Sequence, residues 1–372
     1  MSHSLNLKIE ERTPLKRLDW NYIIVILTLQ VIGLVNLYSA AFSTSHLSRV
    51  FSAQTLWIPI GWSAFFLIAR LNYKRILNLS FFIYLANLIA LILVLLIGKQ
   101  FYGARRWLDL AVFHYQPSET MKLSLILFLG AYLAKHKSEN LGFKELLVPG
   151  LIIGLPFLLT AKQPDLGTAM LLAAIPSSML LFLKVKTRVL VSALLVAAVS
   201  LPLAWNYGLK PYQKNRVLNF LNPERDPRGT GYNSIQAKIA IGSGQILGKG
   251  FRQGSQSQLE FLPERHSDFI FCVLSEEYGF IGGLFTLSLF TILLFLILHT
   301  AANSNDRSGA LICVGVAAFI FWHMLINVGM VTGLLPIVGV PLPLLSYGGS
   351  SMVTFMVSLG LVASVSNQRY MF

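Results

Sequence analysis

The sequence predicts an all-α polytopic membrane protein, and its composition and the grouping of its apolar residues carry that prediction. Hydrophobic residues make up 55% of the 372 positions, whereas charged residues make up only 12%. A soluble globular domain carries about 25% charged residues, so this composition excludes an ordinary soluble enzyme and a disordered chain. The apolar residues are also grouped, since residues 21–48 contain no Asp, Glu, Lys or Arg and comparable runs recur to the C-terminus.

Ten apolar runs are long enough to cross a hydrocarbon core of about 30 Å, which takes about 20 helical residues. The first run follows a charged segment and is longer than the apolar core of a signal peptide, so we expect it to remain as a membrane anchor. We expect a single membrane domain over residues 1–372. The ten predicted helices lie near 20–42, 51–70, 76–98, 119–134, 146–161, 167–183, 187–207, 268–300, 309–333 and 347–366.

The distribution of basic residues predicts the orientation. An even number of helices places both termini on one side, and the short segments on that side, including 1–19, hold most of the Lys and Arg outside the long loops. Because cytoplasmic loops collect Lys and Arg, both termini are expected to be cytoplasmic. The same rule explains the net charge of +14 without nucleic acid, so no nucleic-acid partner is expected.

Two segments on the opposite face carry charge that the orientation rule does not explain. Residues 99–118 read KQFYGARRWLDLAVFHYQPS, and the large loop 208–267, between the seventh and eighth predicted helices, is rich in Lys and Arg. Long loops escape the charge rule, so their charge needs another cause. Either they bind an anionic lipid headgroup such as a pyrophosphate, or they are solvated loops beside anionic lipid.

Asp268 is the first candidate for chemistry. It lies in FLPERHSDFIF (261–271), where the large loop meets the eighth helix. A carboxylate at this interface is partly desolvated and can act as a base toward a lipid headgroup. The alternative is that Asp268 caps the helix, with Ser267 as a competing cap. The neighbouring His266 is expected to be structural.

Three further candidates lie at the same side of the predicted membrane. Glu119 and Lys122 share a helix face in QPSETMK (116–122), either as a self-contained ion pair or with Lys122 reaching a phosphate that Glu119 helps to orient. Asp165, in QPDLGT (163–168), either contacts a ligand or caps the sixth helix. Arg105, beside Arg106 and an interfacial Trp, carries the guanidinium fork that suits phosphate.

Two glycine-rich stretches are less specific. Ser346 lies in LLSYGGSS (344–351), which either exposes backbone N–H groups to a ligand or permits close helix packing. Lys249 lies in GSGQILGKG (242–250), which is only superficially a phosphate loop because it lacks the strand context and the residue after Lys249 is Gly. No nucleotide or organic cofactor is therefore expected.

Charged residues and cysteines deeper in the chain favour structural roles. Glu276 lies about 12 Å below Asp268 along the same helix, with Glu277 beside it. A buried carboxylate must pair with a cation or be protonated, and pairing is the favoured interpretation. Cys272 and Cys313 lie in apolar runs, where buried unpaired cysteines are expected.

At these motifs the chain resembles the SEDS family of bacterial cell-wall polymerases, nearly from end to end. FLPERHSDFIF and NPERDP (222–227) are closer to the elongation members of that family than to the division or sporulation members. The other matching segments are GARRWLDL (103–110), QPSETMK (116–122), QPDLGTA (163–169), GYNSIQAKIAIGSG (231–244) and LPLLSYGGSS (342–351).

The resemblance implies a peptidoglycan glycosyltransferase of the bacterial inner membrane that polymerises lipid II into β-1,4 glycan strands during elongation. It places the essential carboxylate on Asp268. Lys122, Arg105 and basic loop residues would hold the leaving pyrophosphate, either alone or with a divalent cation, Mg²⁺ or Mn²⁺, for which no ligand set is legible. The implied partners are a class B penicillin-binding protein and other membrane proteins of the elongation machinery. The expected substrate-binding residues are Arg105, Glu119, Lys122, Asp165, Lys249 and Ser346.

Two other functions stay open. A lipid II flippase needs charged groups along a path across the whole bilayer, whereas here the candidates cluster at one edge, with Glu276 and Glu277 the main exceptions. No internal repeat of the kind that many transporters carry is visible. A non-catalytic scaffold of the elongation machinery would make Asp268 dispensable.

Overall fold

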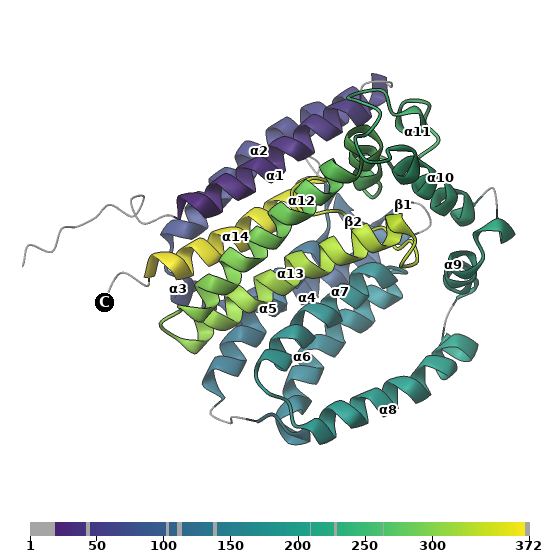
Figure 1. Cartoon of the computed structure of the whole chain (residues 1–372). Coiled ribbons are helices and arrows are strands. Elements are labelled where there is room, and N and C mark those ends of the chain that lie inside the picture. Colours follow the sequence, from purple (N-terminus) through teal and green to yellow (C-terminus); the bar gives the residue numbers. More distant parts are fainter. Residues whose placement is uncertain are drawn as a thin grey trace, which may run out of the picture.

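The computed structural model describes residues 19–41, 45–101, 104–109, 114–136, 140–208, 210–226, 229–262 and 264–368. Long helices packed side by side form the body of the molecule, and a small sheet and several short helices gather at one end of it, here called the loop end (Figure 1). The elements in chain order are α1 (Trp20–Ala41), α2 (Ser45–Arg70), α3 (Tyr73–Asn78), α4 (Ser80–Ile97), β1 (Lys99–Phe101), β2 (Ala104–Asp109), β3 (His114–Tyr115), α5 (Pro117–Lys135), α6 (Phe143–Lys162), α7 (Leu166–Phe182), α8 (Thr187–Leu203), the π-helical turn η2 (Ala204–Gly208), α9 (Pro211–Leu221), the 3₁₀ turn η3 (Pro223–Arg225), α10 (Thr230–Ser243), α11 (Ser255–Gln258), α12 (Ile270–Ala302), α13 (Arg307–Thr332) and α14 (Gly349–Gln368).

All ten predicted apolar runs contain helix, with the third run formed by α3 and α4. By length and composition, seven helices in the described part of the chain can cross a membrane, namely α1, α2, α4, α6, α12, α13 and α14. Helices α7 and α8 are apolar but shorter. The polytopic membrane fold is confirmed, whereas the number of ten spans stays a prediction.

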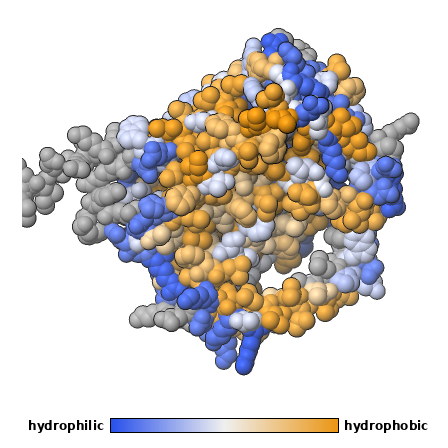
Figure 2. Space-filling view, in the orientation of Figure 1, coloured by the Kyte–Doolittle hydropathy of each residue, from blue (hydrophilic) through white to orange (hydrophobic). Residues whose placement is uncertain are grey.

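The surface of the bundle has the pattern of a protein solvated by lipid around its middle. Figure 2 shows hydrophobic residues over the flank of the helices and hydrophilic residues gathered toward the two ends. Side chains on the flank are strongly exposed, with Leu194 of α8 72% and Phe295 of α12 67% accessible. Water would oppose such exposure, whereas lipid tails solvate it at no cost.

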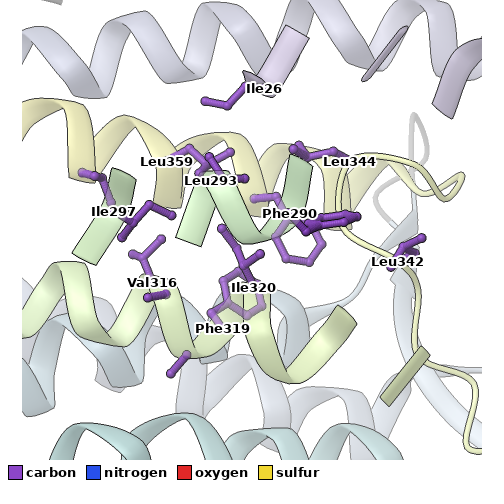
Figure 3. Close-up of a cluster of buried hydrophobic side chains, with 14 of the residues drawn as sticks. Ile26, Phe290, Leu293, Ile297, Val316, Phe319, Ile320, Leu342, Leu344 and Leu359 are labelled. Carbon is purple, nitrogen blue, oxygen red and sulfur yellow. The ribbon is translucent and has the colours of Figure 1, made fainter. Parts of the chain in front are cut away.

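The core lies where α1, α12, α13 and α14 meet. Figure 3 shows Ile26, Phe290, Phe319 and Leu359 converging there from these four helices, and all four side chains are buried. Leu342 and Leu344, from the connection 333–348 between α13 and α14, are buried in the same cluster. This connection is therefore anchored to the core through its second half.

The sheet is a small addition that the all-α prediction did not include. Its three antiparallel strands follow the order β1-β2-β3, with Gln100 of β1 opposite Arg105 and Leu108 of β2 opposite Tyr115 of β3. Residues 99–115 are too polar for a membrane helix, and pairing along the strands satisfies their backbone groups instead.

Helix α12 is broken at Gly279, whose φ of 63° and ψ of −160° lie outside the helical region. The break removes helical partners from backbone groups on both sides of it, and hydrocarbon offers none in exchange. The stretch 245–250, which we call the clip, supplies them from the large loop. The bonds run from Lys249 N to Glu276 O (3.0 Å), from Gly250 N to Glu277 O (2.9 Å), from Phe280 N to Gln245 O (2.8 Å) and from Ile281 N to Ile246 O (3.2 Å).

The clip also brings the predicted cation to Glu276. The Glu276 carboxylate is fully buried and lies 2.8 Å from Lys249 Nζ. It also accepts hydrogen bonds from the backbone N–H groups of Gln256 (2.9 Å) and Ser257 (3.1 Å), which open α11. The predicted pairing of Glu276 is thus confirmed, and Lys249, expected to bind substrate, is engaged inside the protein. Glu277 accepts a hydrogen bond from Ser39 of α1.

We expect Gly279→Ala to destabilise the fold. A non-glycine residue in this backbone region costs roughly 1–3 kcal/mol, and a Cβ at Gly279 would lie 2.4 Å from the backbone nitrogen of Gly248. The melting temperature of the purified protein in detergent should therefore fall by several degrees.

Gly154→Ala in α6 is the matched control, because a Cβ there meets nothing within 4 Å and Ala favours helix over Gly. Equal melting temperatures for the two variants would contradict the clip as a structural requirement.

Candidate functional site

Asp268 lies in a turn at the loop end, two residues before α12 begins. The backbone N–H groups of Ser267, Asp268 and Phe269 all point to the carbonyl oxygen of Glu264, at 3.1, 3.1 and 3.3 Å. The N-cap residue of α12 is Phe269, and it makes no side-chain cap hydrogen bond. The Asp268 carboxylate is therefore not used as a helix cap, which was the alternative interpretation of its position.

Three backbone carbonyls of this turn precede the helix and find their partners in distant parts of the chain. The carbonyl of His266 accepts from Tyr347 N at 3.0 Å. The carbonyl of Ser267 accepts from Ser346 Oγ at 2.6 Å, and that of Asp268 accepts from Asn327 Nδ2 at 3.0 Å. Ser346 also accepts from the backbone N–H of residue 342 at 2.8 Å. Its observed contacts therefore make Ser346 a residue that holds the Asp268 turn.

The surroundings of Asp268 raise the pKa of its carboxyl to about 7. Burial is the largest cause, followed by the negative charge of Glu264, and Asp165 acts in the same direction. A hydrogen bond from Ser267 and the positive charge of Arg106 oppose the increase. A carboxylate whose pKa lies near neutrality is a stronger base than an ordinary Asp, and about half of it is ionised at neutral pH.

Asp165 joins the site through Arg106. The Arg106 guanidinium lies 3.5 Å from Asp165 Oδ2 and donates to the carbonyl of Pro164 at 2.7 Å. Asp165 also accepts from Thr168 N at 3.3 Å and so caps α7. Both interpretations of Asp165, cap and site residue, are therefore compatible with its contacts.

The structure brings Arg106, rather than the predicted Arg105, to this group. Successive residues of a strand point to opposite faces. Arg105 is exposed on β2 and makes a long contact of 3.5 Å with the carbonyl of Leu95.

Glu119 and Lys122 form a buried ion pair in α5. Lys122 Nζ lies 2.6 Å from Glu119 Oε1 and 2.9 Å from His323 Nε2, with side-chain exposures of 1% for Lys122 and 5% for Glu119. His323 Nδ1 lies 2.9 Å from the carbonyl of Phe319. The Nδ1–H tautomer fits both contacts, because Nε2 then accepts from the ammonium. The self-contained ion pair is thus the interpretation that the geometry supports.

This buried group is connected to the Asp268 turn through α13. His323 and Asn327 are four residues apart on that helix, so they lie on the same face one turn apart. Lys122 therefore contacts one residue of α13, and Asp268 is held by the next residue along the same face.

Three of these residues were missed by reasoning from charge alone. Arg106 was passed over in favour of its neighbour, and His323 and Asn327 were not singled out. A signal was present, since His323 and Asn327 are polar residues at positions i and i+4 inside an apolar run, and polar residues at membrane depth are candidates by default.

A protein-only metal site is not formed by the described residues, among which no three His, Cys, Asp or Glu side chains gather. Asp165 and Glu264 raise the pKa of Asp268 without forming such a group with it.

The chain matches the FtsW/RodA/SpoVE family, described as "Cell cycle protein", over residues 19–371. The peptidoglycan glycosyltransferase MrdB of Escherichia coli (strain K12) is 41% identical over 290 residues, which cover 78% of each chain.

Two solved structures share the fold. A chain described as "Structural coordination of polymerization and crosslinking by a peptidoglycan synthase complex" is 30% identical, with a TM-score of 0.82, covering 95% of this chain and 99% of that chain. The rod shape determining protein RodA of Thermus thermophilus is 28% identical, with a TM-score of 0.71, covering 95% of this chain and 98% of that chain.

We expect Lys122→Met to destabilise the protein strongly, because it leaves the buried carboxyl of Glu119 without its cation. Breaking a buried pair by removing one partner costs about 3–5 kcal/mol. The double variant Glu119→Gln/Lys122→Met removes both charges and should recover most of the lost stability. Melting temperatures in detergent measure both effects.

Lys162→Met provides the control, since Lys162 is exposed and its replacement should change stability by no more than about 0.5 kcal/mol. If Lys122→Met and Lys162→Met had the same melting temperature, the assignment of a buried ion pair between Lys122 and Glu119 would be wrong.

Proposed function

Because this chain belongs to the FtsW/RodA/SpoVE family of cell cycle proteins, we propose that it is a peptidoglycan glycosyltransferase that polymerises lipid II into β-1,4 glycan strands during cell-wall elongation. The relative of 41% identity bears the name peptidoglycan glycosyltransferase. The single observation that carries the chemistry is the Asp268 carboxylate, held at the loop end with a pKa near neutrality.

The proposed reaction needs one inversion and one proton transfer. Lipid II presents a sugar in α-linkage to a pyrophosphate, whereas the product linkage is β-1,4, so a single displacement at the anomeric carbon suffices. The 4-hydroxyl oxygen of the acceptor attacks the anomeric carbon, and the bond between that carbon and the pyrophosphate oxygen breaks. Asp268 accepts the proton from the attacking hydroxyl. The lipid pyrophosphate leaves with the electron pair of the broken bond.

The cationic side chains have distinct parts in this proposal. Arg105 is exposed on β2 and offers its guanidinium fork to a phosphate. Arg106 orients Asp165 beside the reacting groups. Lys122 is hydrogen-bonded to Glu119 and His323 and contributes to the site through these contacts. A divalent cation would take most of its oxygen ligands from the pyrophosphate, since no three carboxyl or imidazole groups gather in the described ranges.

The proposal includes a partner that crosslinks the strands. It is a class B penicillin-binding protein, acting with other membrane proteins of the elongation machinery. Its support is the likeness, at a TM-score of 0.82, to a chain from a peptidoglycan synthase complex whose description joins polymerization to crosslinking.

Asp268→Asn tests the catalytic role. Asn keeps the size and much of the hydrogen bonding but cannot accept the proton, so the rate of strand formation from lipid II should fall by about 10²–10⁴-fold. The assay is gel analysis of glycan strands made by purified protein with its penicillin-binding partner.

Asp306→Asn is the matched control. Asp306 caps α13 at the opposite end of the bundle, where Asn caps equally well, and the rate should stay within about twofold of wild type. An Asp268→Asn enzyme that kept more than about a tenth of the wild-type rate would remove Asp268 from the role of base.

The pH dependence of polymerisation should report the pKa of Asp268. The deprotonated carboxylate is the active form, so the rate should rise through pH about 7 and fall about tenfold per pH unit below it. Glu264→Gln removes a negative charge that raises this pKa, so the midpoint should move to lower pH. Arg106→Gln removes a positive charge that lowers it, so the midpoint should move to higher pH. Shifts in the same direction would contradict the assignment.

The proposed orientation places both termini in the cytoplasm and the loop end outside the inner membrane. Cys272 and Cys313 are buried and should not react with a membrane-impermeant maleimide. In intact spheroplasts, a cysteine introduced by Ser255→Cys at the loop end should react. One introduced by Asn305→Cys, between α12 and α13, should react only after lysis. The reverse pattern would invert the topology.

A further inference from the structure

Asn327 is a fully buried amide near the C-terminal end of α13. Its Nδ2 donates to two backbone carbonyls, that of Asp268 at 3.0 Å and that of Val340 at 2.7 Å. These two carbonyls belong to different irregular segments, the turn before α12 and the connection 333–348. One side chain therefore ties a core helix to both segments.

One of these segments carries the Asp268 carboxylate, and the other passes beside it. Residue 339 is a glycine with φ of 72°, and a Cβ built on it would lie 3.1 Å from Asp268 Oδ2. The backbone of the connection thus passes directly beside the carboxylate, one residue before the carbonyl that Asn327 holds. A shift of either segment would change the position of the carboxylate relative to this wall.

Asn327 makes both of these bonds with its amide nitrogen. Its Oδ1 is buried without a hydrogen-bond partner among the described residues. Turning the amide over would not help, because Oδ1 would then face the two carbonyl oxygens. A buried unsatisfied oxygen is destabilising, and such groups in a native structure call for an explanation.

We propose that Asn327 is a positioning residue for glycosyl transfer, which fixes the Asp268 carboxylate against the connection 333–348 through its two backbone hydrogen bonds. The inference rests on the role of Asp268 proposed above. In this proposal α13 is the rigid support that holds the base in position. Its Phe319 and Ile320 lie in the centre of the core. Preorganisation of this kind matters because misplacing a reacting group by about 1 Å costs about 10²-fold in rate.

Two variants test the proposal. Asn327→Leu keeps the volume and removes both donors, whereas Asn327→Asp keeps the shape and places a carboxyl where the amide donated. Each should lower kcat for strand formation by about 10–100-fold while the KM for lipid II stays within about threefold, because Asn327 does not touch substrate. Rates are expressed per molecule that binds lipid II, so partial unfolding does not enter the comparison.

The control is Asn367→Leu. Asn367 of α14, at the other end of the bundle, donates from Nδ2 to one backbone carbonyl, that of Ala69, at 3.1 Å, and its Oδ1 is likewise buried without a partner among the described residues. Its replacement removes a comparable hydrogen bond far from Asp268 and should leave kcat and KM within about threefold of wild type.

The outcomes separate positioning from other roles. A kcat loss for the Asn327 variants alone supports the proposal. Equal losses for the Asn327 and Asn367 variants, a raised KM with unchanged kcat, or more than about a third of wild-type kcat in either Asn327 variant would each overturn it. Asp268→Asn measured in the same series keeps the two proposals apart, because a full rate in that variant would defeat the role of Asp268 itself.

Discussion

The constraint on which this structure depends is that backbone groups leaving a helix at membrane depth need partners within the protein, because hydrocarbon offers none. Helix α12 meets this constraint twice. At Gly279 the clip 245–250 supplies two N–H donors and two carbonyl acceptors from the large loop. At the turn before the helix, three carbonyls are satisfied from α13 and from the end of the connection 333–348. The loop end is therefore joined to the helices by hydrogen bonds, and the position of Asp268 follows from these bonds.

The buried charged side chains also have partners within the protein. Glu276 is matched by Lys249, and Glu119 by Lys122, which also contacts a neutral imidazole. Charges that neutralise one another in fixed pairs do not form the continuous polar path that a flippase for a charged headgroup requires. Asp268 differs, because its near neighbours Glu264 and Asp165 are acidic and raise the pKa of its carboxyl. The arrangement thus favours a catalytic carboxylate over a transport pathway.

The fold class, the family resemblance and the pairing of Glu276 could be predicted from the sequence. Each depends on a feature that the sequence itself contains, namely the length of the apolar runs, the separated motifs and a charged residue inside an apolar run. The sequence was not sufficient for partners that depend on three-dimensional contacts. Ser346 was expected as a ligand residue because its glycine-containing motif could expose backbone N–H groups, yet its hydroxyl donates to the carbonyl of Ser267. Lys249 was grouped with the basic loop, yet the break at Gly279 brings it to Glu276. Neither contact has a local pattern, because each joins segments that are far apart in the chain.

Arg105 and Arg106 are neighbours on β2, and which of the two faces Asp165 affects the proposed chemistry. Strand alternation sends the two guanidinium groups to opposite faces of β2, and Arg106 is directed onto Asp165 and the carbonyl of Pro164. A guanidinium paired directly with Asp268 would stabilise the carboxylate and lower its pKa, and a carboxylate of low pKa is a weak base. With Arg106 engaged by Asp165, its effect on the pKa of Asp268 is smaller than the opposing effects of burial and Glu264. The ion pair between Arg106 and Asp165 therefore keeps a cation near Asp268, while Asp268 retains the basicity that its proposed role as a base requires.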